Sequence, residues 1–148
     1  MTRRIITGLN ATGQSTVLID GPVQPYSHGG GGHVWRSETV PADNSPTADI
    51  SIDTFSYDLF HDGGSNFFVV EMAPGDTFVP HATDTLDYIV IMQGEVVLVV
   101  DTGEVTLRAG DCIADRGILH TWRNDSAAPA TYAVITLPAH PVGKGRNV

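Results

Sequence analysis

Short β-prone runs, each closed by a turn-forming residue, divide the whole chain and limit the folds that it can adopt. The 148 residues include 16 glycines and 9 prolines, and no stretch of a dozen residues repeats apolar positions every three to four. Runs of this kind are typical of an all-β sandwich or barrel. The expected strands are residues 15–19, 67–72, 87–92, 95–100, 104–107 and 131–137.

Length and charge exclude several classes of protein. A chain of this size builds one domain with its own core. No apolar run approaches the ~20 residues of a membrane helix, and the first residues turn polar too early for a secretory signal. We therefore expect a cytoplasmic protein with no membrane partner. The formal net charge of −9 repels phosphate backbones and argues against a nucleic-acid partner.

The first half of the chain differs from the second in composition. Residues 1–66 include four consecutive glycines at 29–32 and few apolar clusters, so we expect an N-terminal arm with one or two short strands that belongs to the same domain. The barrel core is expected at 67–137 and a tail at 138–148. The single cysteine, Cys112, is expected to be a buried thiol within a strand.

The strand at 87–92 is apolar on both faces. Ile89 and Ile91 share one face, while Val90 and Met92 share the other with Tyr88. A half-exposed strand would alternate with polar residues, so both faces should be covered. The sequence therefore predicts a homodimer, in which the arm or a second subunit covers the outer face.

The first of two glycine–histidine segments runs from residue 75 to residue 94. His81 follows Gly75 after five residues, Thr83 and Asp87 come next, and Gly94 closes the segment. Equal parity places the side chains of His81 and Thr83 on the same face of a strand. Inward positions of neighbouring strands converge in a barrel, so Asp87 on the next strand can share their space.

The second segment places Gly110 and Gly117 before His120 and Asn124 after it. The two segments and their 15-residue spacer together resemble the motifs of small single-domain cupins of the cupin-2 conserved barrel type. The resemblance is strongest to a subgroup with a Thr-Asp-Thr segment in the first motif. It covers roughly residues 67–137 and implies an antiparallel double-stranded β-helix, or jelly-roll barrel.

The cupin motif implies a metal site, from which this chain departs at two positions. Thr83 stands in place of the second histidine, and Asp87 stands in place of the glutamate. His81, Asp87 and His120 would form a set of two imidazoles and one carboxylate, which suits iron, manganese, nickel or zinc. The alternative is a barrel without metal, in which the histidines are satisfied polar groups and Asp84 and Asp87 cap a turn.

Further residues complete the candidate site. Asp84 and Asp87 are the candidates for moving a proton. Thr83, Trp122 and Arg116 are the candidates for substrate binding, because Trp122 shares the parity of His120 and an arginine can clamp an acidic group.

Three loop histidines, His28, His33 and His61, are expected to be solvated, although one of them could fold over the pocket and replace the missing ligand. The tail histidine, His140, is expected at the surface.

Three functions are compatible with these residues. The first is a metal-dependent decarboxylase, lyase or isomerase acting on a small oxygenated or carboxylated metabolite, with the metal as Lewis acid. The second is a non-heme iron dioxygenase with the same ligands. The third is a small-molecule-binding protein without metal or catalysis. The fold alone does not choose among them.

Overall fold

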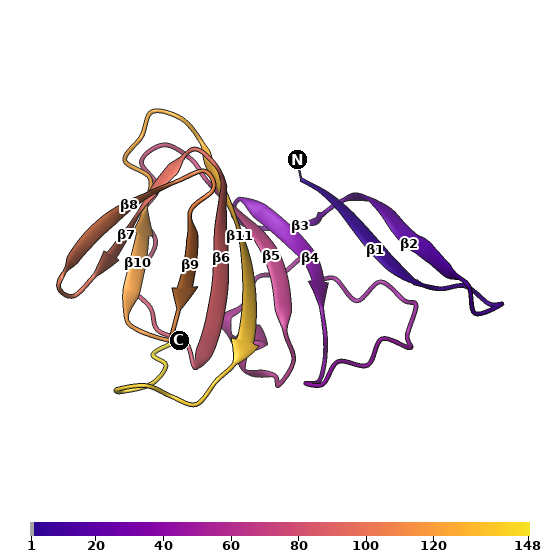
Figure 1. Cartoon of the computed structure of the whole chain (residues 1–148). Coiled ribbons are helices and arrows are strands. Elements are labelled where there is room, and N and C mark those ends of the chain that lie inside the picture. Colours follow the sequence, from indigo (N-terminus) through magenta and orange to yellow (C-terminus); the bar gives the residue numbers. More distant parts are fainter. Residues whose placement is uncertain (1) are drawn as a thin grey trace.

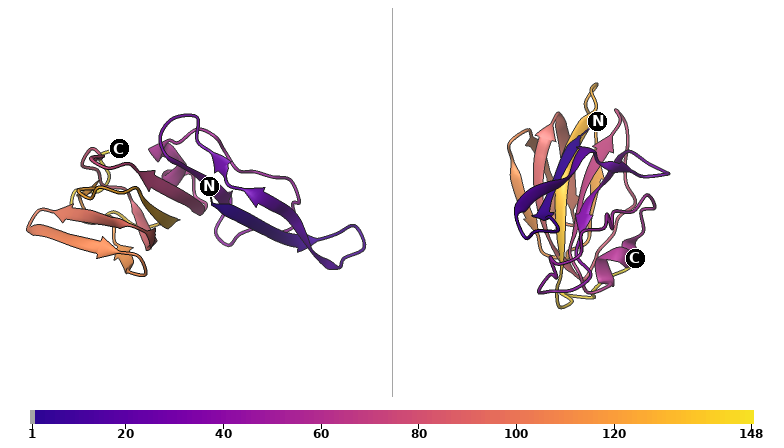
Figure 2. Two further views of the ribbon diagram at one scale, coloured as in Figure 1. Left: turned by 90° about the horizontal axis from the view of Figure 1, so that it is seen from above. Right: turned by 90° about the vertical axis from the view of Figure 1, so that its right-hand side faces the viewer.

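The computed structural model describes residues 2–148 and is built almost entirely of strands. Two sheets face each other, and an N-terminal hairpin extends from one side of them (Figures 1 and 2). The elements are β1 Arg3–Leu9, β2 Ser15–Pro22, β3 Gln24–Pro25, β4 Gly31–Arg36, the short 3-10 helix η1 Tyr57–His61, β5 Asn66–Met72, β6 Thr85–Gln93, β7 Glu95–Val100, β8 Gly103–Arg108, β9 Cys112–Asp115, β10 His120–Arg123 and β11 Ala130–Pro138.

The two facing sheets form the expected barrel. The larger sheet has the order β3-β4-β5-β11-β6-β9, and the smaller has the order β10-β7-β8, with antiparallel pairing throughout. Two isolated bridges, Thr77 with Arg123 and His81 with His120, tie the β5–β6 connection to β10. The predicted all-β double-stranded β-helix is confirmed.

The core lies between the two sheets, where inward positions of each strand meet. Ile89 and Ile91 of β6 are buried there, as are Val96 of β7 and Trp122 of β10. Their outward neighbours on β6 alternate with them, as a pleated strand requires. The hydrophobic pattern of the sequence thus fixes which face of β6 turns inward.

The outer face of β6 is left uncovered by residues 2–148. Tyr88, Val90 and Met92 are each between 43% and 48% exposed. Cys112 pairs with Val90 on the edge strand β9 and is also exposed, so the expectation of a buried thiol is wrong. The reason is parity, since Ile113 takes the inward position and turns Cys112 outward.

The arm contains four strands where one or two were expected, and β3 and β4 extend the larger sheet. Its glycines allow a close approach: a Cβ on Gly31, whose φ is +109°, would lie 2.0 Å from the carbonyl oxygen of Val69. Only glycine fits such a contact in this backbone conformation.

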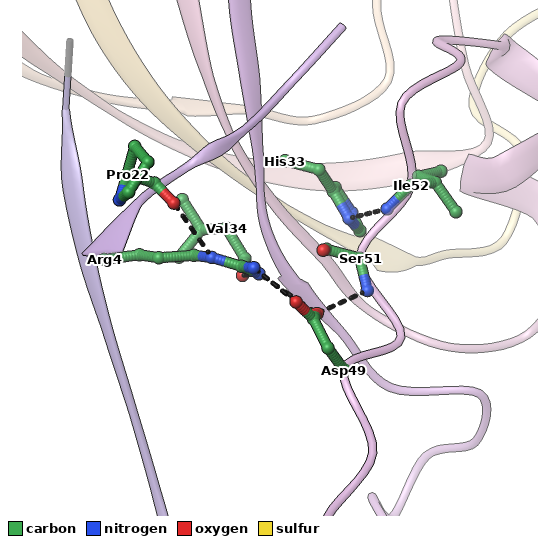
Figure 3. Close-up of polar contacts among 7 residues, drawn as sticks. All are labelled: Arg4, Pro22, His33, Val34, Asp49, Ser51 and Ile52. Atoms are coloured by element: carbon green, nitrogen blue, oxygen red, sulfur yellow. Dashed lines mark hydrogen bonds and ion pairs between the residues drawn. The ribbon is translucent and has the colours of Figure 1, made fainter. Parts of the chain in front are cut away.

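An ion pair between a buried arginine and an exposed aspartate holds the β1–β2 hairpin to the rest of the arm (Figure 3). The guanidinium of Arg4 pairs with Asp49 and donates hydrogen bonds to the carbonyl oxygens of Pro22 and Val34. Nearby, His33 is 1% exposed and its Nδ1 accepts a hydrogen bond from the Ile52 amide at 3.2 Å. The expectation that His33 is solvated is therefore wrong, because β4 carries it inside the arm.

The C-terminal tail returns to the first glycine–histidine segment. The Ala82 amide donates to Asn147 Oδ1 at 2.7 Å, and the Asn147 amide donates to the Ala82 carbonyl at 3.1 Å. The Arg146 amide donates to Asp84 Oδ1 at 2.9 Å.

Among residues 2–148 no helix is both long and apolar enough to cross a membrane.

Candidate active site

A cavity of about 410 Å³ is lined by residues of the arm and of both sheets of the barrel, and some of the residues singled out in the sequence are among them. His81, Asp87, His120 and Trp122 all line it. A volume of this size lies in the range of small-molecule sites. The rest of its wall is mainly aromatic and aliphatic.

Two imidazoles lie side by side in this cavity. His81 and His120 exchange backbone hydrogen bonds of 2.9 and 3.0 Å, and their ring centroids are 4.5 Å apart. Nδ1 of each ring lies 2.9 Å from a carbonyl oxygen two residues earlier, that of Val79 or Ile118. A proton on Nδ1 satisfies each carbonyl and leaves Nε2 as the nitrogen available to a ligand.

Asp115 makes the two imidazoles unequal, and the sequence did not single it out. Its Oδ2 lies 2.9 Å from Nδ1 of His120, and both side chains are 4% exposed. Its Oδ1 accepts hydrogen bonds from the amides of Gly117 and Ile118, which fix the carboxylate. No carboxylate ion pair of this kind involves His81 among residues 2–148. The only sequence signal for Asp115 is that it shares the parity of Ile113, which faces inward.

The position of Asp115 beside only one imidazole shifts the pKa values of the two histidines in opposite directions. Burial alone would lower the pKa of His120, but the carboxylate of Asp115 outweighs it and raises that pKa above its usual value. Burial raises the pKa of Asp115, but His120 and the two amides bring it below its usual value. Burial, together with the charge of His120, lowers the pKa of His81. The surroundings therefore push the proton affinities of the two imidazoles apart, that of His120 upward and that of His81 downward.

Asp87 is a second carboxyl group at the same place. It pairs with Asp115 across β6 and β9, and its Oδ1 is buried with no hydrogen-bond partner among the described residues. Burial, and to a smaller extent the charge of Asp115, raises the pKa of Asp87 to about 6. Two neighbouring carboxylates cannot both ionise cheaply, so Asp87 holds a proton more readily than an ordinary aspartate.

The other predicted site residues lie elsewhere. Thr83 is buried but its Oγ1 bonds to Thr85 Oγ1 at 2.7 Å, outside the cavity lining. Asp84 also lies outside the cavity, because its carboxylate accepts the Arg146 amide and so caps the tail. Arg116 is exposed and faces a separate hollow beside the tail, since its parity on the chain is opposite to that of Asp115.

The three loop histidines differ in burial and in their position relative to the cavity. His28 lies at the rim of the cavity, whereas His33 is buried in the arm. His61 is partly buried, and its Nε2 accepts the Asp84 amide at 3.3 Å. His61 thus supports the loop behind His81 without facing the cavity, and His140 is exposed.

The cavity offers donor atoms for a metal ion, but its described residues do not bring three ligands together. Two free Nε2 atoms and the unpartnered Oδ1 of Asp87 are suitable donors. Across residues 2–148, however, no three His, Cys, Asp or Glu side chains come together as a group that could hold a metal ion. The side chains as arranged therefore do not fit a metal centre with three protein ligands.

Part of the aromatic lining comes from the arm, which sequence reasoning did not connect with the site. Phe55 packs edge-on against Tyr26 and Tyr57 with ring centroids 5.7 and 5.1 Å apart. Tyr57 also lies 5.0 Å from the ring of His81. Tyr26, Phe55 and Tyr57 all lie before the expected barrel core at 67–137. No local sequence pattern therefore indicated that they would line its cavity.

Comparison with known proteins identifies the barrel region. The model of the cupin domain family (Cupin_2) matches residues 68–136. "Phomopsin biosynthesis cluster protein D" of Diaporthe leptostromiformis is 40% identical over 86 residues, which are 57% of this chain and 46% of that protein. "Cupin-domain-containing oxidoreductase srdD" of Neurospora crassa is 29% identical over 135 residues, 82% of this chain and 65% of that protein. The chain thus spans about half to two thirds of these curated relatives.

Among solved structures, a sugar phosphate isomerase of the cupin superfamily from Silicibacter pomeroyi is 28% identical. The match covers 51% of each chain with a TM-score of 0.46.

Proposed function

Residues 68–136 of this chain are a cupin domain of the cupin-2 barrel type, and we propose that its cavity catalyses a non-oxidative proton transfer on a small oxygenated molecule. The class of reaction is that of an isomerase or lyase acting next to a carbonyl group. The observation that carries the proposal is the imidazole pair, 4.5 Å apart, with Asp115 behind only one ring. Groups whose surroundings push their proton affinities apart are suited to act as base and acid.

The two imidazoles divide the reaction between them. His81 is held by the Val79 carbonyl with Nε2 unprotonated, so Nε2 takes a proton from the carbon beside the carbonyl. The electrons of that C–H bond form the C=C bond of an enol. The carbonyl oxygen becomes the enol oxygen by taking the Nε2 proton of cationic His120. Where the enol also carries a hydroxyl group on its other carbon, that hydroxyl returns a proton to His120, the proton on His81 goes to the former carbonyl carbon, and the product is an isomer of the substrate.

Two carboxyl groups support this transfer in different ways. Asp115 stabilises the charge that His120 carries when protonated, because its Oδ2 lies 2.9 Å from Nδ1 of that ring, while the Ile118 carbonyl orients the ring. Asp87, with its unpartnered Oδ1 and raised pKa, can hold or release a proton at the same end of the cavity. The aromatic wall limits the water that could compete for these protons.

A metal-assisted enzyme is the second candidate. The unpartnered Oδ1 of Asp87 favours it, because a buried carboxylate oxygen without a partner is costly and a cation would satisfy it. Asp87 would then have to join His81 and His120. A divalent cation such as iron, manganese, nickel or zinc would supply Lewis-acid chemistry there. The word "oxidoreductase" in the name of the Neurospora relative also keeps oxidation within this second candidate.

The test is deuterium exchange into an enolisable ketone. We expect the chelator-treated protein in D₂O to accelerate deuteration of the α-carbon of 2-tetralone, followed by NMR. His81→Gln and His120→Gln should each remove most of the acceleration, by about 10²-fold or more. His140→Gln, on the exposed tail, should keep it.

Two results would count against the proposal. If 2-tetralone binds but exchanges no faster than in buffer, the proton-transfer proposal is wrong. If exchange appears only after a divalent metal is added to the chelator-treated protein, the second candidate replaces the first.

A further inference from the structure

Most of the cavity lining is aromatic or aliphatic, in contrast to the polar side chains of His81, Asp87 and His120. Phe55 makes edge-on contacts with Tyr26, Tyr57, Phe60 and Phe68, with centroid separations of 5.1 to 6.1 Å. Phe55 is nevertheless 38% exposed. An aromatic cluster left open at a concave surface is typical of a binding site, since a ligand would remove the remaining apolar surface from water.

A second group of aromatic residues in the cavity lining comes from the barrel strands. Trp122 on β10 stacks against Tyr132 on β11 with centroids 5.1 Å apart, and its ring lies edge-on to that of His120 at 5.9 Å. A flat ring in the cavity can meet these aromatic rings in edge or offset contacts, which saturated rings of the same size cannot form. The walls therefore select for aromatic character as well as for low polarity.

The charges around the cavity argue against an anionic ligand. No lysine or arginine occurs among the described residues that line it. The imidazole of His120 already lies 2.9 Å from the carboxylate of Asp115, Asp87 is close by, and the whole chain carries a formal net charge of −9. A carboxylate would enter this field without a free cation to receive it.

We infer that the cavity binds a neutral, oxygenated aromatic compound of one or two rings, with the rings against its aromatic lining, which includes Phe55 and Trp122, and the oxygen toward His81 and His120. A space of about 410 Å³ holds roughly 14 water molecules at ~30 Å³ each, which leaves room for two fused rings. The inference rests on the cavity of the proposed function but concerns binding, so the two can fail separately. Binding without deuterium exchange would leave this inference standing and overturn the proposed chemistry.

The experiment measures the binding of three matched probes to the chelator-treated protein by calorimetry. The probes are 2-tetralone, its saturated analogue 2-decalone, and the anion 1,2,3,4-tetrahydro-2-naphthoate. We expect 2-tetralone to bind about tenfold or more tightly than each of the others. Equal or tighter binding of either other probe, or no binding of 2-tetralone, overturns the inference.

A pair of variants tests whether Phe55 contributes to the preference for 2-tetralone over 2-decalone. Phe55→Leu retains apolar volume but removes the ring, so the preference for 2-tetralone over 2-decalone should fall severalfold. Phe67→Leu is the matched control, because Phe67 is 37% exposed and does not line the cavity. An equal fall in both variants, or in neither, contradicts the assignment of Phe55 to the ligand wall.

Discussion

Replacing His33 with glutamine should make the protein more resistant to acid. The imidazole is 1% exposed, and burial, followed by the charges of Arg36 and Arg4, lowers its pKa to about 4. Nδ1 accepts the Ile52 amide, so the ring proton is on Nε2, which has no hydrogen-bond partner among the described residues. A second proton can enter only by breaking the bond to Ile52. Glutamine does not titrate in this range, so the variant lacks this proton-linked cost.

The magnitude follows from the two pKa values. In the unfolded chain His33 takes a proton near pH 6.5, whereas in the native protein it does so near pH 4, so the unfolded state binds more protons between these values. The stability that the neutral ring contributes is therefore complete above pH 6.5 and is lost as the pH falls toward 4. At pH 4.5 the loss is about 2.5 kcal/mol, at 1.36 kcal/mol per pKa unit.

Asp87 acts in the opposite direction and would hide this effect in the wild type. Its pKa of about 6 lies above that of an unfolded aspartate, so protonation of Asp87 adds stability as the pH falls. The measurement is therefore a difference: urea unfolding of the wild type and of His33→Gln at pH 7 and at pH 4.5. The variant should gain about 2.5 kcal/mol relative to the wild type between the two pH values. A difference that stays constant within about 0.5 kcal/mol would refute the reasoning, and His140→Gln should show no change.

Two further predictions concern the glycine run and the outer face. Gly31→Ala should destabilise the fold by several kcal/mol more than Gly29→Ala in urea unfolding, because both have positive φ but only position 31 meets a carbonyl oxygen; equal costs would contradict this. We propose that a second copy of the chain covers Tyr88, Val90 and Met92. The residues paired with Tyr88 and Val90 on β9 and β11 carry no charge, although the chain has a formal net charge of −9. Light scattering should give twice 15.8 kDa for the wild type and a monomer for Val90→Glu; a wild-type monomer would remove the proposal.

The barrel strands were accessible from the sequence because local signals agree on them. β5, β6, β7, β8 and β11 all contain the expected runs, since each combines β-branched residues with a turn residue at its end. β3 and β4 were missed because their glycines and prolines disfavour strands locally. Their pairing depends on the close approach of Gly31 to Val69, which only the folded chain provides.

Part of the candidate site could also be predicted from the sequence, because it depends on the alternation of side chains along single strands. Parity placed His81, Asp87, His120 and Trp122 toward one interior, and all four line the cavity. Asp115 was missed because its role depends on cross-strand pairing with Asp87, which is not local in sequence. Phe55 was missed because a loop of the arm brings it there. Such contacts are set by the tertiary fold, which parity along a single strand does not contain.

The inequality of the two imidazoles is the central claim, and an NMR titration of the histidine ring nitrogens tests it most directly. In the wild type, His120 should titrate above the ordinary histidine range and His81 below it, each with Nε2 as the unprotonated nitrogen when neutral. Asp115→Asn keeps an oxygen for the Gly117 amide but removes the charge, so the pKa of His120 should fall to that of His81 or lower. If His120 titrates at or below His81 in the wild type, or does not respond to Asp115→Asn, Asp115 does not divide the roles of the two rings and the account is contradicted.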